Sequence, residues 1–335
     1  GRCDLPEDSP PEDRDAEFLS GSMVRVYLNV QQDHLRDRLV QLSARVTATA
    51  SEADAQRVSV VTESAPTDDE KSRQVERELL TAFTEDLYDA VRTVVDGIDF
   101  SEHYQEEPYL HLYTYTEGES ENLIEAFDRH ETPLLNSFHD LVEGQPGVDT
   151  PRVSSLRDEI TSHISLETPS AGLIHAYDEI QPPTEAYSKP RTVDEWSYEP
   201  SYLPDGDTVS LRSIFRRRLF NISVDWETAN GSVVVDPTTE DDVDGLNTRV
   251  RYGAGIPLGY ILSAVGMIDD DWIDEAGFSA DSSLSGYEIG NYRYHDASER
   301  SQEIVPEDVR ALGRNLCDVL EHLERGLYFR DTEIT

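Results

Sequence analysis

The run from Val24 to Gln31 constrains the fold most tightly, because its side chains alternate in character from one residue to the next. A period of two, with many β-branched and aromatic residues, is typical of a strand in a sheet. A polar turn follows this run, and a second strand-like run covers residues 39–49. The two runs predict a β-hairpin at the start of an α/β domain.

Further strands and helices are predicted downstream of the hairpin. A third strand-like run covers residues 57–62, and residues 74–95 carry an apolar stripe with helical spacing. A buried strand is predicted over residues 109–115. Three helices are predicted to follow it, over 119–130, 132–143 and 151–166. Three strands followed by alternating helices and strands predict an α/β sandwich with a mixed sheet and flanking helices.

The second half of the chain has a different composition and a different pattern of predicted elements. Residues 181–210 are rich in Pro, Tyr and Asp and predict a connection between two regions. Helices are expected over residues 211–220 and 256–268, with a short strand over 232–236. A long amphipathic helix is expected over 306–329, with acidic residues in its first turn, where the helix dipole favours them. The predicted organisation is an acidic linker (1–21), an α/β domain (22–180), a Pro/Tyr-rich connection (181–210) and a mainly helical region (211–330).

The composition indicates the salt conditions in which this protein works, and it says little about the binding partners. The formal charge is −41, and 26 of the 28 basic residues are Arg. An acidic excess of this size destabilises a compact state unless salt screens it, so the chain is expected in the cytoplasm of a halophile. Two cysteines indicate a reducing compartment, and no apolar run is long enough to span a membrane. The chain begins with Gly1, so we expect a fragment of a longer protein.

Several segments resemble the middle region of a haloarchaeal family whose members join a RecB-family nuclease, an RNase H-like domain and a superfamily 1 helicase annotated DEAD/DEAH. The segments that carry the resemblance are VRVYLNVQQDHLRDRLVQLSARV (24–46), YLHLYTYTEGESENLIEAFDRH (109–130), PRVSSLRDEI (151–160), TVSLRSIFRRRLF (208–220), RYGAGIPLGYILSAVG (251–266) and YRYHDASERSQEIVPEDVRALGRNLCDVLEHLER (292–325). The resemblance implies an RNase H-like domain over residues 22–180 and a role in DNA processing or repair. Its implied partners are DNA and the nuclease and helicase domains of the same protein, with the nuclease upstream and the helicase downstream.

Asn29 and Gln31 decide what the resemblance implies about catalysis. In a metal-dependent RNase H-like nuclease, two carboxylates at this spacing on the first strand hold Mg²⁺, which prefers hard oxygen ligands. This chain has two neutral amides there, so we expect a domain without its own active site and assign no cofactor. One alternative is an active 3′–5′ exonuclease with Mg²⁺ or Mn²⁺ at a shifted site built from Asp33, Asp140 and Asp158. Another is a non-enzymatic scaffold that docks a partner through the long C-terminal helix.

Arginines at positions 212, 216, 217 and 218 form the densest positive cluster of this acidic chain. Arg suits bidentate contacts with phosphate, so one hypothesis is binding to a DNA backbone. The competing interpretation is ion pairing with carboxylates of the same chain or of a neighbouring domain. Both lysines, Lys71 and Lys189, lack the glycine-rich context of a nucleotide-binding P-loop, so no ATPase centre of that type is predicted.

Overall fold

The structure is a computed structural model, and it describes the elements that build one mixed sheet and its covering helices. The described residues are 23–33, 36–66, 68–99, 110–130, 132–143, 153–164 and 305–333, with short pieces between 172 and 265. For residues 140–143, 163 and 328–333, and for the short strands between 197 and 252, the description covers the backbone alone.

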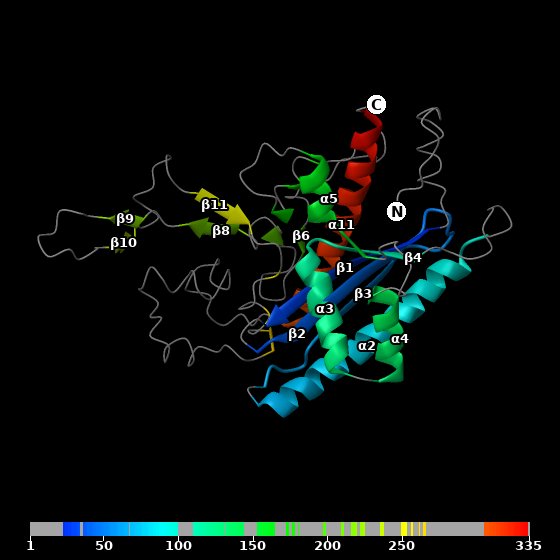
Figure 1. The fold of residues 1–335 in the computed structure, drawn as a ribbon, viewed down its shortest axis with the longest axis horizontal. Coiled ribbons are helices and arrows are strands. Elements are labelled where there is room, and N and C mark those ends of the chain that lie inside the picture. Colours follow the sequence, from blue (N-terminus) through cyan, green and yellow to red (C-terminus); the bar gives the residue numbers. More distant parts are fainter. Residues whose placement is uncertain are drawn as a thin grey trace, which may run out of the picture.

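Five strands form the central sheet (Figure 1). They are β1 (Val24–Asp33), β2 (Arg38–Thr47), β3 (Gln56–Val61), β4 (Leu110–Thr114) and β5 (Val153–Ser155). Their order is β3-β2-β1-β4-β5. β2 is antiparallel to both of its neighbours, whereas β1, β4 and β5 run parallel to one another. The carboxyl ends of β1, β4 and β5 therefore point toward the same edge of the sheet.

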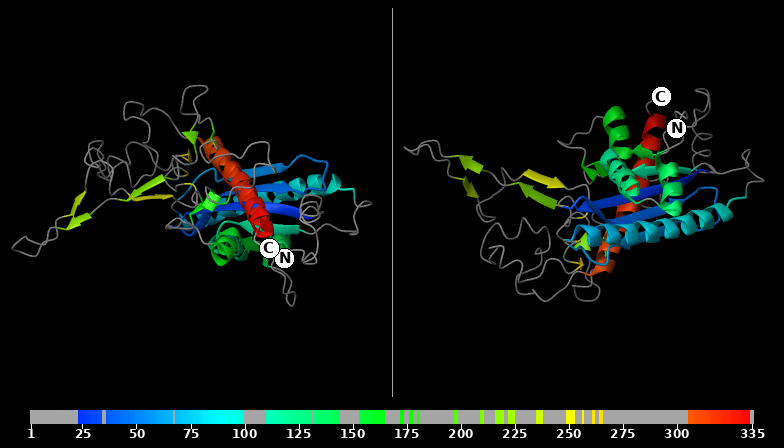
Figure 2. Two further views of the ribbon diagram at one scale, coloured as in Figure 1. Left: turned by 90° about the horizontal axis from the view of Figure 1, so that it is seen from above. Right: turned by 60° about the horizontal axis from the view of Figure 1, so that its bottom comes forward.

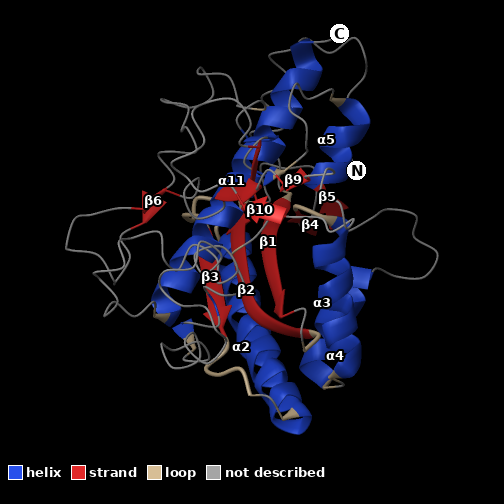
Figure 3. Cartoon of the chain, turned by 90° about the vertical axis from the view of Figure 1, so that its left-hand side faces the viewer, coloured by secondary structure: helices blue, strands red, loops and turns tan. Residues whose placement is uncertain are grey.

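Helices cover both faces of this sheet (Figure 2). One face carries α2 (Asp69–Asp96), α3 (Glu117–Arg129) and α4 (Pro133–Glu143). The other face carries α11 (Pro306–Glu333), beside α5 (Leu156–His163). Figure 3 shows α2 and α11 on opposite sides of the strands. Two hydrophobic clusters result, one on each side of the sheet.

Side-chain alternation along β1 separates the two clusters, and side chains on both faces of this strand are buried. Val24, Val26, Leu28 and Val30 belong to the cluster under α2 and α3, whereas Tyr27 belongs to the cluster under α11. Opposite β1, the register shifts between Gln31 and Gln32, which leaves Val40 of β2 without a partner. A bulge of this kind places two successive residues on one face. Val40 and Gln41 accordingly both face α11, whereas Leu39 and Leu42, on either side of this pair, pack in the opposite cluster.

Most predicted elements of the first half are confirmed, with shifts of a few residues at their ends. The helix predicted over 74–95 begins five residues earlier, where Asp68 caps it by accepting a hydrogen bond from the Lys71 amide at 3.0 Å. The single helix predicted over 151–166 is wrong in its first turn, because Val153–Ser155 pairs with β4 as the edge strand β5. Three residues are too few to show an alternating pattern, so only the pairing reveals this strand.

Between residues 197 and 252, the described pieces are short strands, whereas the sequence predicted one helix, over 211–220, and one short strand, over 232–236. The helix predicted over 211–220 is wrong at its end, where Arg216–Leu219 forms β8 and pairs with β11 (Arg249–Tyr252). Strand pairing here overrides the helical propensity of Arg and Leu. The remaining pairs are β6 (Ser197–Tyr198) with β7 (Val209–Ser210), and β9 (Ile222–Val224) with β10 (Val235–Pro237). Most of the helix predicted over 256–268 lies outside the described residues, whereas the C-terminal helix is confirmed as α11.

Candidate functional site

Asn29 and Gln31 lie where the carboxyl ends of the parallel strands meet. Both occupy alternate positions of β1 with Tyr27, on the face that α11 covers. Asn29 is 2% exposed and Gln31 is partly buried. The register of β1 with β4 pairs Tyr27 with Tyr113, so Asn29 is level with the first residues after β4. Asn29 and Gln31 therefore lie at the edge of the sheet where the parallel strands end.

The two amides form a hydrogen-bonded relay. Gln31 Nε2 donates to Asn29 Oδ1 at 3.1 Å, and Asn29 Nδ2 donates to Glu119 Oε1 at 3.2 Å. The relay aims an N–H group of Asn29, rather than an oxygen, at the Glu119 carboxylate. A cation at this position would need side-chain oxygen atoms as its ligands. The amide orientation that satisfies Glu119 cannot supply them.

Glu119 is the acidic residue that the sequence analysis overlooked. It is the third residue of α3 and closes a capping box, accepting hydrogen bonds from the amides of Thr116 at 2.9 Å and Tyr115 at 3.0 Å. The amide of Val30 adds a longer bond of 3.4 Å across from β1. Burial raises the pKa of Glu119 to about 7, although the backbone donors act in the opposite direction. A Thr-x-x-Glu pattern after a predicted strand was the available signal, and it indicates a helix start rather than a site.

Helix α11 covers this part of the sheet closely. Gly313 lies against Ser43 and Gln41, which are the cross-strand partners of Asn29 and Gln31. A Cβ at position 313 would clash with both side chains and force them to move, so glycine permits this close approach. One turn further along α11, Cys317 is fully buried, and its burial raises the pKa of its thiol well above the usual value. Helix α11 therefore covers the amide relay.

The three aspartates of the alternative metal site do not form a shared centre among the described side chains. Asp33 is 1% exposed and forms an ion pair with Arg36 in the turn between β1 and β2. Asp158 is exposed in the first turn of α5, and the side chain of Asp140 lies outside the described residues. Among the described residues, no group of three or more His, Cys, Asp or Glu side chains is arranged to hold a metal ion.

A shallow pocket of about 340 Å³ lies between the first turns of α3 and α5. Its acidic lining residues are Glu117, Asp158 and Glu159, and most of its other lining residues are serines. Asp158 is thus brought near a second and a third carboxylate, but in a place that neither Asp33 nor Asn29 lines.

The arginine cluster is only partly described. Arg212 and all four of the cluster's side chains lie outside the described residues. The backbone places Arg216, Arg217 and Arg218 on strand β8, which corrects the helix expected there.

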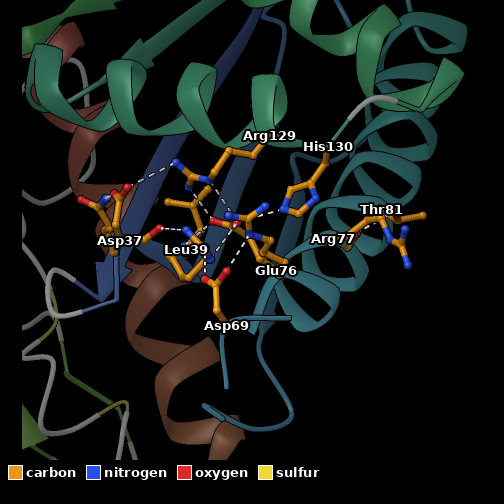
Figure 4. A network of polar contacts seen from close by, with 11 residues as sticks. Asp37, Leu39, Asp69, Glu76, Arg77, Thr81, Arg129 and His130 are labelled. Atoms are coloured by element: carbon orange, nitrogen blue, oxygen red, sulfur yellow. Dashed lines mark hydrogen bonds and ion pairs between the residues drawn. The ribbon is translucent and has the colours of Figure 1, made fainter. Parts of the chain in front are cut away.

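A buried polar network joins α2, β2 and the end of α3 (Figure 4). Its centre is Glu76, whose side chain is completely buried. Glu76 accepts hydrogen bonds from Arg129 Nη2 at 2.8 Å, His130 Nε2 at 2.9 Å and the Leu39 amide at 2.8 Å. Burial alone would raise the pKa of Glu76, but these three donors together hold it below its usual value. The sequence signal was a carboxylate beside the apolar stripe of the helix, seven residues before Phe83.

A second network attaches α11 to the sheet through a row of carboxylates spaced three residues apart. Asp318 accepts from Arg45 at 3.0 Å and from Arg57 at 2.9 Å, and Glu321 also pairs with Arg45. The third carboxylate, Glu324, accepts from the hydroxyls of two stacked tyrosines, Tyr27 at 3.0 Å and Tyr113 at 3.2 Å. Burial and the charge of Glu324 raise the pKa of both tyrosines well above the usual value, so each keeps the proton that it donates.

Comparison with known proteins assigns no family to the chain. No protein-family model matches the chain, and neither the curated proteins nor the solved structures include a significant match. Within the part of the chain that the structure describes, none of the helices has the length and the apolar character that crossing a bilayer requires.

Proposed function

We propose that the sheet and its covering helices form an RNase H-like domain that has lost metal-dependent catalysis. The parent protein is a DNA-processing enzyme of a halophilic archaeon, in which a RecB-family nuclease and a helicase carry out the chemistry. In this proposal the domain is a structural module between those two activities, and it works in the salt-rich cytoplasm that its charge of −41 suits.

Two features of the fold support the RNase H-like assignment. The order β3-β2-β1-β4-β5, with β2 antiparallel to its neighbours, is the arrangement expected of an RNase H-like sheet. Helices connect the parallel strands and cover both faces, as that fold requires. The resemblance of segments 24–46 and 109–130 to the haloarchaeal family falls on β1, β2, β4 and α3, which surround the amide pair.

One observation carries the loss of catalysis: the Asn29 amide donates to Glu119 where a nuclease would need a metal between two carboxylates. Mg²⁺ needs near-octahedral oxygen coordination, and an N–H group in the ligand position repels it. Asn and Asp have the same shape, so the substitution keeps the local packing while it removes the charge. Gly313 closes the same face from α11, over Ser43 and Gln41, which pair with Asn29 and Gln31.

The test has two parts, a nuclease assay of the unaltered chain and a metal-binding measurement on a double variant. The full chain is incubated in high KCl with 3′-labelled single-stranded DNA and Mg²⁺ or Mn²⁺, and we expect no metal-dependent shortening of the DNA. The double variant Asn29→Asp with Gln31→Glu should acquire Mn²⁺ binding, measured by calorimetry, because it places two carboxylates beside Glu119. The matched control is Asp158→Asn, which removes one carboxylate at another place on the same sheet edge.

Two results would refute the proposal. Metal-dependent cleavage by the unaltered chain that disappears in Asp33→Ala would establish the shifted active site instead. Failure of the double variant to bind Mn²⁺ while it retains a native circular dichroism spectrum would show that this edge is not a former metal site.

A further inference from the structure

The β8–β11 ribbon concentrates positive charge on a chain that is otherwise acidic. Arg216–Leu219 and Arg249–Tyr252 pair antiparallel, with the sequences RRRL and RVRY. Five of these eight residues are Arg, whereas the whole chain has only 28 basic residues among 335. The sequence analysis identified only the first strand of this ribbon, because its partner is separated from it by some 30 residues of chain. The pairing adds two arginines to that cluster.

The register distributes the arginines over both faces of the ribbon. Arg217 is paired with Arg251, and Arg249 with Leu219, so three arginine positions share one face. Arg216 is paired with Tyr252, and Arg218 with Val250, so the other face has two arginine positions and an aromatic one. Figures 1 and 2 show the ribbon beside the five-stranded sheet and not within it.

Ribbon stability alone does not explain this arrangement. Like charges that stand directly opposite each other destabilise an antiparallel pair, and the register sets Arg217 opposite Arg251. A two-stranded ribbon is marginal in water even without such a pair. An anionic partner would convert the repulsion into attraction, and arginine binds phosphate oxygens with two parallel hydrogen bonds.

We infer that the β8–β11 ribbon binds the phosphate backbone of duplex DNA. This inference rests on the proposed role in DNA processing and assigns a contact surface within this chain. The major groove of a duplex admits a two-stranded β-ribbon and has a phosphate ridge on each side of it. Arginine positions on both faces fit that setting, whereas binding of a single strand relies on a charged groove with several aromatic side chains that stack on the bases. A four-residue strand is about 13 Å long, comparable with the groove width of about 12 Å.

The experiment compares two triple variants of the full chain that lose the same charge. The ribbon variant is R217Q/R249Q/R251Q, and the control is R73Q/R77Q/R92Q, whose three arginines are exposed on α2. Binding to a fluorescein-labelled 30-base-pair duplex is measured by anisotropy over a series of KCl concentrations. A single-stranded 30-mer is measured in parallel. Circular dichroism at each KCl concentration establishes that the variants remain folded.

We expect the ribbon variant to bind the duplex at least 10-fold more weakly than the unaltered chain, and the control to bind within 2-fold of it. The slope of log affinity against log salt should fall in magnitude by about 2 to 3 in the ribbon variant, because each lost phosphate contact removes about 0.9 from it.

Three outcomes would overturn the inference, and each separates it from the proposed function. Equal duplex affinities of the two variants would mean that the ribbon arginines pair with this chain's own carboxylates, while a DNA-binding role survived elsewhere. Tighter binding of the single strand than of the duplex would remove the groove interpretation. No measurable DNA binding by the unaltered chain would remove the ribbon site without affecting the metal-binding test of the former active site.

Discussion

Glu76 offers the sharpest test of how this fold is held together. Replacing it with Ala removes the acceptor of three donors: the buried His130 ring, the buried Leu39 amide and the Arg129 guanidinium, whose side chain is 20% exposed. Removing one member of a buried ion pair costs about 3–5 kcal/mol, because the remaining charge and donors have lost both water and partner. We therefore expect Glu76→Ala to lower the free energy of unfolding by about 4 kcal/mol.

The assay is urea unfolding at pH 7 and constant high KCl, followed by circular dichroism. With an m-value of about 2.5 kcal/mol/M, the expected loss shifts the midpoint down by about 1.6 M. Glu76→Gln keeps one acceptor oxygen and should lose about 2 kcal/mol. The matched control is Glu78→Ala on the same helix, where the exposed carboxylate accepts from Gln74 at 2.9 Å and the change should stay within about 0.5 kcal/mol.

The pH dependence of this effect has a definite sign. The folded pKa of Glu76 is held below its usual value, so the unfolded chain takes up a proton at a higher pH than the folded chain. The contribution of Glu76 is therefore complete above the ordinary pKa and is lost as the pH falls through the folded pKa. The stability difference between the unaltered chain and Glu76→Gln should shrink in acid. A Glu76→Ala loss within 1 kcal/mol of the Glu78→Ala control would refute the assignment of a stabilising role to the network.

Three further predictions concern α11 and the amide site. Gly313→Ala should destabilise the fold by about 1–3 kcal/mol, because the added Cβ clashes with side chains of the sheet. Gly118→Ala should stabilise α3 by up to about 1 kcal/mol, because position 118 has open space around it. Thermal unfolding measures both changes. The folded pKa of Glu119 is raised to about 7, so its contribution to stability is present below pH 4.5 and lost as the pH rises through 7. Relative to the unaltered chain, Glu119→Gln should thus gain roughly 2 kcal/mol in urea unfolding between pH 5 and pH 8, and an unchanged difference would contradict the raised pKa. Asp318→Ala removes the carboxylate that Arg57 pairs with and one of the two that Arg45 pairs with, so hydrogen exchange should accelerate in α11, including at the Cys317 amide, and remain slow in α2. Equal acceleration in both helices would argue against a local contact.

The first half of the fold could be predicted because its elements are long and strongly periodic. The alternation of β1 and the apolar stripe of α2 each report their own burial, so both were recognised within a few residues. β5 and β8 are short, and pairing with a distant strand decides their state, so a local pattern suggested helices in their place. A shift of one residue in the pairing of β1 would exchange the side chains of its two faces. The alternation of β1 therefore also fixes its register with the neighbouring strands.

The candidate site divides in the same way. The sequence alone identified Asn29 and Gln31 as amides at the end of the first strand, because their spacing and residue types are local properties. Only the tertiary structure decided what those amides contact: Glu119, 90 residues away, accepts from Asn29, and Gly313 of α11 closes the same face. The same holds for Glu76 and for the carboxylate row of α11, whose donors come from other elements of the chain. A hydrogen bond between distant residues depends on the packing of whole elements, and composition and periodicity do not encode that packing one segment at a time.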